Sequence, residues 1–196
     1  MKKLALILLL IPSILKSQST LETEFLKQLN DYRDSLGLSK LEYDSNLSLA
    51  SEHFLTYELK VGKVVKHIES IDFPDFTEIS TPEERVSKLT NFNLAKRLIK
   101  DSLGVKTFVG DEVTAGSKTL PKFVKFAGKG QTLKISDGTE YVTTGDTCKD
   151  LSFVILKSLK DSKGHNFAIT DPGKPGMKVG ISFREGILVM VYGYKK

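Results

Sequence analysis

The stretch LSFVILKSLKDSKGHNFAITDPGKPGMKVGISFREGILVMVYGY, which runs from Leu151 to Tyr194, decides the fold of this chain. Its first part predicts a helix with one buried face, because apolar side chains recur there every three or four residues. Asp146 or Thr147 can cap the start of this helix, and Gly164 can end it. The apolar positions are Leu151, Val154, Ile155 and Leu159.

The second part of the stretch predicts a β-hairpin. Residues 179–184 and 187–192 are rich in β-branched and aromatic side chains, and Glu185-Gly186 separates them. Two residues with glycine second are typical of a tight hairpin turn. The predicted order is therefore a helix, a turn that contains His165, a loop at 171–176 and a hairpin. A histidine between a helix end and a sheet can be held rigidly and still meet a ligand.

Helices are predicted at the other end of the chain as well. Ser19-x-x-Glu22 is a capping box, and an apolar helix face follows it until Gly37. A second helix is predicted between Asp44, which can cap it, and Gly62, which stops it. A third begins at Thr81-Pro82-Glu83-Glu84, another capping box with proline at the first helical position. Helices first and a strong hairpin last place the chain in the α+β class.

Motifs at both ends of the chain resemble a known family. Ser162-x-Gly164-His165-Asn166, followed after a proline-containing loop by Val179-Gly180-Ile181-Ser182, is similar to the C-terminal signature of bacterial CAP domains, also called SCP-like extracellular proteins. Asn30-x-x-Arg33 resembles the opening of the same family. His67, after the second helix, and the Pro82-x-x-Arg85 helix match family positions in their order. The resemblance implies a three-layer α-β-α sandwich around a central antiparallel sheet.

The resemblance also implies a cleft that contains two histidines and a glutamate. His67 and His165 match the histidines, and Glu112 is the counterpart of the glutamate in the family's Gly-Glu-Asn motif. An extra residue precedes Glu112 in that motif and the asparagine is absent, so Asp111 is the alternative carboxylate. Two histidines and one carboxylate can bind a divalent ion, zinc above all, with a fourth position open for water. Asp161 in the last helix is a shorter substitute for the family's second glutamate.

Three further side chains are given structural interpretations. His53 lies at the border of the apolar face of the second helix and is interpreted as a histidine with local hydrogen bonds. Cys148 is the only cysteine, which excludes an internal disulfide. Its place in the first helical turn can lower a thiol pKa, but a small buried apolar side chain is the simpler interpretation. Ser162 is interpreted as a cap, because no Gly-x-Ser-x-Gly elbow of a serine hydrolase is present.

Residues 117–144 have no counterpart in the family pattern. The runs 123–126, 132–135 and 140–143 alternate in the manner of strands, and Asp137-Gly138 supplies a hairpin turn. The sequence therefore predicts an inserted β-hairpin or a small three-stranded flap that leans on the main domain. We expect this insertion to modify ligand access and to be dispensable for the fold.

Composition bounds the class of protein. A chain of 196 residues with 40% apolar side chains predicts one domain with a core, here residues 18–196. Residues 1–17 predict a signal peptide, since Lys2-Lys3 precedes an apolar run, Leu4 to Ile11, that is too short to span a bilayer. Cleavage near Ser17 would give a secreted or periplasmic protein that is not an integral membrane protein. The formal charge of the chain is +5, and removal of the three lysines of this segment leaves +2. The remaining sequence has no basic stripe interleaved with aromatic residues, and this argues against nucleic-acid binding.

Three functions are open from the sequence. The first is a secreted binding or interaction module that uses the histidine and glutamate cleft for an extracellular lipid, glycan or protein. The second is a divalent-metal-dependent hydrolase, including a protease, that uses the same cleft. The third is a structural protein with a vestigial cleft. The sequence assigns no catalytic residue and predicts no cofactor other than the metal.

Overall fold

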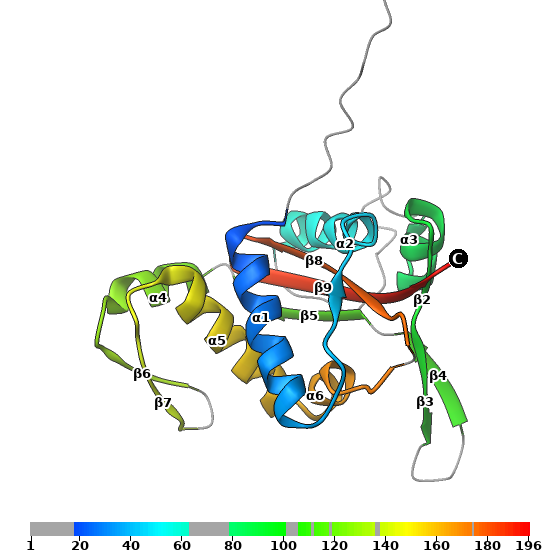
Figure 1. The fold of residues 1–196 in the computed structure, drawn as a ribbon. Helices are drawn as coiled ribbons and strands as arrows, with labels where there is room; N and C mark the ends of the chain where they lie inside the picture. The colour runs from blue at the N-terminus through cyan, green and yellow to red at the C-terminus, as the bar shows by residue number, and fades with distance from the viewer. Residues whose placement is uncertain are drawn as a thin grey trace, which may run out of the picture.

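The computed structural model describes residues 18–62, 79–100, 106–110, 112–117, 119–135, 138–173 and 175–196. The predicted signal peptide, residues 1–17, lies outside them. None of the described helices combines the length and apolar character needed to cross a membrane. The elements in chain order (Figure 1) are α1 Thr20–Ser35, β1 Glu42–Tyr43, α2 Ser48–Val61, α3 Pro82–Leu89, β2 Phe92–Leu94, β3 Lys96–Lys100, β4 Lys106–Gly110, β5 Glu112–Gly116, α4 Leu120–Ala127, β6 Thr132–Lys134, β7 Glu140–Val142, α5 Thr147–Asp161, α6 Lys163–Ile169, β8 Lys178–Arg184 and β9 Ile187–Lys195.

A five-stranded sheet forms the middle of the molecule. Its centre is the predicted hairpin of β8 and β9, and Glu185 and Gly186 turn between them with φ angles of 51° and 84°. Positive φ at both positions is what a type I′ turn requires. Strands β2 and β5 pair antiparallel with the other edge of β9, while β1 pairs parallel with β8. The sheet is therefore mixed, and the prediction of an antiparallel sheet is wrong at β1, which enters from the connection after α1 and runs in the direction of β8.

Helices lie on both faces of this sheet (Figure 1). Alternate residues of β9 divide between the two faces, as the pleat of a strand requires. One set packs against α2 and α3, and the other joins the core formed with α1, α5 and α6. Burial on both faces explains why this strand is an almost continuous apolar run, and the predicted α+β class is confirmed. The first set is Ile187, Val189 and Val191, and the second is Leu188, Met190 and Tyr192.

The predicted starts of α1, α3 and α5 are confirmed. Helix α2 instead begins at Ser48 without a side-chain cap on Leu47, and Asp44, its predicted cap, accepts from the N–H groups of Asn46 and Leu47 in the turn before the helix. Ser19 and Glu22 exchange side-chain and backbone hydrogen bonds at the start of α1, with distances of 3.2 and 2.8 Å. Thr81 and Glu84 form the same capping box at the start of α3. Asp146 caps α5 by accepting from the first free backbone N–H groups of the helix. Each cap satisfies N–H groups that have no partner within the helix.

The predicted turn around His165 is wrong, because this segment is helical. Helix α5 ends at Asp161, and Ser162 adopts an extended conformation with φ −84° and ψ 114°. The chain then begins α6 at once, and the N–H of Asn166 donates to the Ser162 carbonyl at 2.7 Å. Gly164 has no positive φ and so does not terminate a helix in the way predicted.

Asn30 and Arg33, the two residues of the Asn-x-x-Arg motif, connect α1 to the segment that follows it and to α6. The side chain of Asn30 accepts from the Leu41 N–H at 2.8 Å and donates to the Leu41 carbonyl at 3.0 Å. The buried guanidinium of Arg33 donates to the carbonyls of Ser39, Ile169 and Asp171 at 2.8–3.0 Å. Arg33 therefore ties α1 to the C-terminal end of α6, and both residues of the Asn-x-x-Arg motif have structural roles.

The insertion is part helix and part hairpin. Residues 120–127 form α4, so the strand predicted at 123–126 is wrong. Strands β6 and β7 form the predicted hairpin, as a two-stranded sheet of their own. As predicted, the insertion leans on the main domain, because its Val124 and Leu133 pack with Leu21 of α1 and Leu151 of α5.

Candidate functional site

Glu112, the predicted cleft carboxylate, is held in a buried ion pair. Its Oε1 accepts from Nη2 of Arg85 at 2.6 Å, and its Oε2 accepts from Nε at 3.3 Å. The two side chains are 1% and 0% exposed. The Arg85 guanidinium also lies 4.1 Å from the centre of the Phe54 ring and donates to the Ser80 carbonyl at 2.7 Å. This carboxylate therefore fixes α3 against the sheet.

Other polar groups follow Glu112 on the same face of the sheet. Two residues further along β5, Thr114 donates its hydroxyl to the buried carboxylate of Glu58 on α2, at 2.8 Å. Ser51 of α2 and Ser182 of β8 share a hydrogen bond of 2.9 Å between their hydroxyls. These contacts place Glu112 in a row of polar groups beneath α2 and α3.

His165 belongs to the opposite side of the sheet. It lies on α6, where it is partly exposed, and the next residue, Asn166, accepts a hydrogen bond from the Tyr32 hydroxyl at 3.1 Å. Ile169 anchors this helix in the core that contains Val113 of β5. Because neighbouring residues of a strand point to opposite faces, the side on which Val113 packs is opposite to that of Glu112. The sheet therefore lies between Glu112 and α6.

The described residues do not bring the predicted metal ligands together. His67 and the alternative carboxylate Asp111 lie outside the described residues, so the predicted site of His67, Glu112 and His165 stays a prediction. Within the described ranges, no group of three histidine, cysteine or acidic side chains could hold a metal ion. Asp161, the candidate for a fourth position, forms an ion pair with Lys157 one turn earlier on α5. His53 is partly buried on α2 and has interactions of its own.

The environment of Cys148 makes its thiol less reactive. Burial raises its pKa above the ordinary value, and the nearby charges of Asp146 and Glu24 raise it further. A raised pKa lowers the thiolate fraction at neutral pH. The structure thus favours the interpretation of Cys148 as a small side chain that packs beside the insertion.

A pocket of about 290 Å³ lies where the insertion meets α5. Gly116 and Ser117 at the end of β5 close one side of it, and Lys134 and Ser158 add polar groups. This volume is at the lower end of the range for small-molecule sites. The sequence did not predict the pocket, because five of its nine lining residues come from the insertion. Its apolar lining is Leu120, Leu133, Ile135, Val154 and Ile155.

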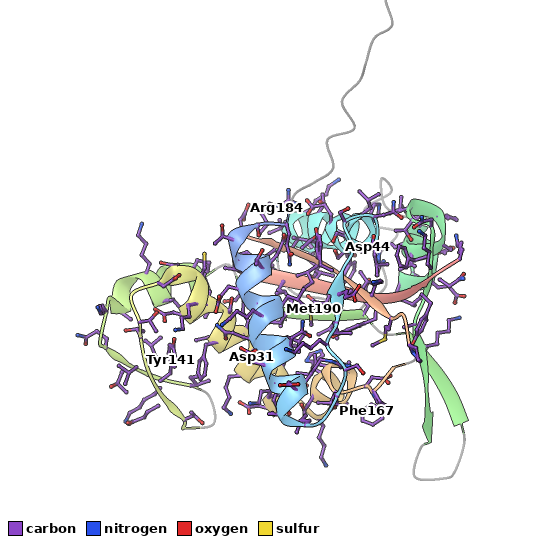
Figure 2. The ribbon with its side chains drawn as sticks, in the orientation of Figure 1. Asp31, Asp44, Tyr141, Phe167, Arg184 and Met190 are labelled. Carbon is purple, nitrogen blue, oxygen red and sulfur yellow. The ribbon has the colours of Figure 1, made fainter. Side chains whose placement is uncertain are left out.

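The hairpin wall of this pocket is attached firmly to α5. The Tyr141 ring stacks on Phe153, with ring centres 4.0 Å apart and 14° between planes. Its hydroxyl donates to Oδ1 of the buried Asp150 at 2.6 Å, and Thr144 and Gly145 donate to the same carboxylate. Burial alone would raise the pKa of Asp150, but these hydrogen bonds outweigh it and the pKa is lowered. Figure 2 shows Tyr141 on the side of the molecule that the hairpin occupies.

A second hollow, of about 620 Å³, lies between α1, α5 and the hairpin. Lys160 extends its ammonium group over the Tyr32 ring, 4.2 Å from the centre. Both signs of charge line this hollow, including Glu24, Asp31 and Lys149. Mixed charges select no single ligand class, so the smaller and more enclosed pocket beside α5 is the better defined candidate site.

Comparison with known proteins supports the fold alone. No family model and no curated protein matches the chain. Among solved structures, the chain is similar to an outer surface protein from Borrelia burgdorferi, with 15% sequence identity and a TM-score of 0.53. The match covers 92% of this chain and 96% of that chain. The similarity of fold therefore spans almost the full length of both proteins.

Proposed function

We propose that this chain is an exported CAP/SCP-like domain, a three-layer α-β-α sandwich that acts as a ligand-binding module. The family proposal rests on the order of its motifs and on helices at both faces of one sheet. Export is supported by the apolar run from Leu4 to Ile11 after two lysines, and by the similarity in fold to an outer surface protein.

The apolar pocket between the insertion and α5 carries the proposal of ligand binding. Concave sites with mostly apolar walls and a few polar groups are the usual form of small-molecule sites. Here the walls are aliphatic and the polar groups are two serines and one lysine. The proposed extracellular ligand is therefore a small, largely apolar molecule of lipid character, which makes a glycan or a protein the weaker choice.

The hydrolase alternative depends on residues other than Glu112. A general base or metal ligand must have its carboxylate oxygens available, whereas both oxygens of Glu112 accept hydrogen bonds from Arg85. A hydrolase would therefore have to use His165 together with His67 and Asp111, which lie outside the described residues. The binding module is the function that the described geometry supports better.

Fluorescence of the neutral probe N-phenyl-1-naphthylamine tests the proposal. We expect the mature protein to enhance the emission of the probe, and Val154→Trp to abolish this enhancement by filling the pocket. Val142→Trp is the matched control, since Val142 is 60% exposed on the same hairpin outside the pocket lining. Equal emission with all three proteins would contradict a binding site in this pocket.

A further inference from the structure

The shape of the apolar pocket restricts its ligand further than its polarity does. Val154 and Ser158, on opposite ends of its α5 wall, are four residues apart, a rise of about 6 Å along a helix. On the facing wall, Leu133 to Ile135 spans about 7 Å of extended chain. The site is thus a short slot between one helical turn and one strand segment.

The apolar part of the described lining is aliphatic, and Ser117, Lys134 and Ser158 are its polar members. Leu133, Ile135, Val154 and Ile155 present branched hydrocarbon side chains, and no aromatic side chain is among the described residues that line it. A volume of about 290 Å³ with such walls suits a flexible hydrocarbon segment better than a rigid system of several rings.

We propose that the slot binds the end of a single unbranched alkyl chain, with the polar head of the ligand outside in solvent. This inference rests on the proposed binding function and names the ligand class for it. The rim does not select the charge of the head, because Lys134 is opposite Glu140 in the register of β6 and β7, so that a cation and a carboxylate are neighbours. The alkyl chain of the ligand therefore determines its affinity, and fatty acids, alcohols and acyl esters all contain the hydrocarbon chain that the slot recognises.

Competition against the neutral probe, with series of carboxylates and alcohols from about four to about fourteen carbons, tests the inference. Each buried methylene should strengthen binding by about fourfold until the slot is filled, after which affinity should stop rising. Carboxylates and alcohols of equal length should compete within a few-fold of each other. A ring compound with the same number of carbons should bind more weakly than the chain.

Variants separate this inference from the binding function itself. Val154→Trp should weaken the longest chains by at least about tenfold, the equivalent of two lost methylene contacts. The chain-length series on the unmodified protein gives the answer even if this variant fails to fold. Affinity that is independent of chain length, or a preference for the ring compound, would overturn the alkyl-chain inference while probe binding leaves the binding function intact. Absence of probe and chain binding together would overturn both.

Discussion

Replacement of Glu112 by glutamine tests whether this residue stabilises the fold or serves a site. The substitution keeps the shape of the side chain but removes its charge and turns an NH₂ group toward the Arg85 donors. Arg85 is fully buried, so its charge would lose its ionic partner in a medium that solvates it poorly. Breaking a buried pair by removing one partner costs about 3–5 kcal/mol. With a urea slope of about 2 kcal/mol per M, the unfolding midpoint should fall by about 2 M.

Two controls make this result interpretable. The exposed pair of Lys96 and Glu83 has the same separation, 2.6 Å, with side chains 40% and 62% exposed. Glu83→Gln should therefore cost less than about 1 kcal/mol. The double variant Arg85→Met with Glu112→Leu should recover most of the lost stability, because apolar replacement of both partners leaves no buried charge. Equal effects of Glu112→Gln and Glu83→Gln in urea unfolding would refute the structural role of Glu112.

Three other outcomes are expected. The pKa of Asp150 is below its ordinary value of 3.8, so the stability that its carboxylate contributes is complete above pH 3.8 and is lost as the pH falls through the lowered pKa. Tyr141→Phe removes a hydrogen-bond donor to this carboxylate and should move the loss of stability to higher pH, as measured by acid unfolding followed by circular dichroism. Gly180→Ala should lower the free energy of unfolding by about 1–3 kcal/mol in thermal unfolding, because the added Cβ would lie 2.5 Å from the Leu47 backbone at the start of α2. Gly164→Ala is the control and should be neutral or stabilising, because a Cβ at Gly164 would have no atom within 4 Å. The predicted metal site is tested by calorimetric titration with zinc: His165→Ala should weaken binding, and equal weak binding by both proteins would contradict the site.

Local rules predicted the parts of the fold that depend on neighbours in sequence. The Ser19 and Glu22 capping box spans three residues, and the type I′ turn at Glu185-Gly186 spans two, so each is complete in the sequence itself. The apolar period of α5 likewise needs no partner to be recognised. These elements supply the framework on which the rest of the fold packs.

The errors arose in short segments whose apolar pattern fits both the two-residue period of a strand and the 3.6-residue period of a helix. Residues 123–126 alternate as a strand does, but Leu120, Val124 and Ala127 also have the spacing of one helix face, and Pro121 stands in the first turn of α4. The helical alternative wins because that face packs against Leu151 on α5. Such a choice depends on a partner well beyond the local window, which a local pattern does not contain.

The direction of the Glu112 side chain could not be predicted from the sequence for a related reason. Which face a strand residue occupies depends on its register, and a shift by one residue moves every side chain to the other face. In β5 the pairing of Glu112 with Val191 directs the carboxylate toward Arg85 and away from α6. The resemblance to the family's Gly-Glu-Asn motif could not reveal this direction, because such a motif gives the order of the residues and not the register of the strand.

Two buried carboxylates, Glu112 and Asp150, have structural roles. Glu112 is neutralised by Arg85, and Asp150 accepts hydrogen bonds from Tyr141, Thr144 and Gly145, so each charge is matched by fixed donors. A catalytic carboxylate must instead keep an oxygen for a substrate, water or metal. The two carboxylates join α3 to the sheet and the hairpin to α5. The second of these attachments also holds the wall of the apolar slot in place, so loss of the Asp150 hydrogen bonds should weaken both the fold and the affinity of the slot for alkyl chains.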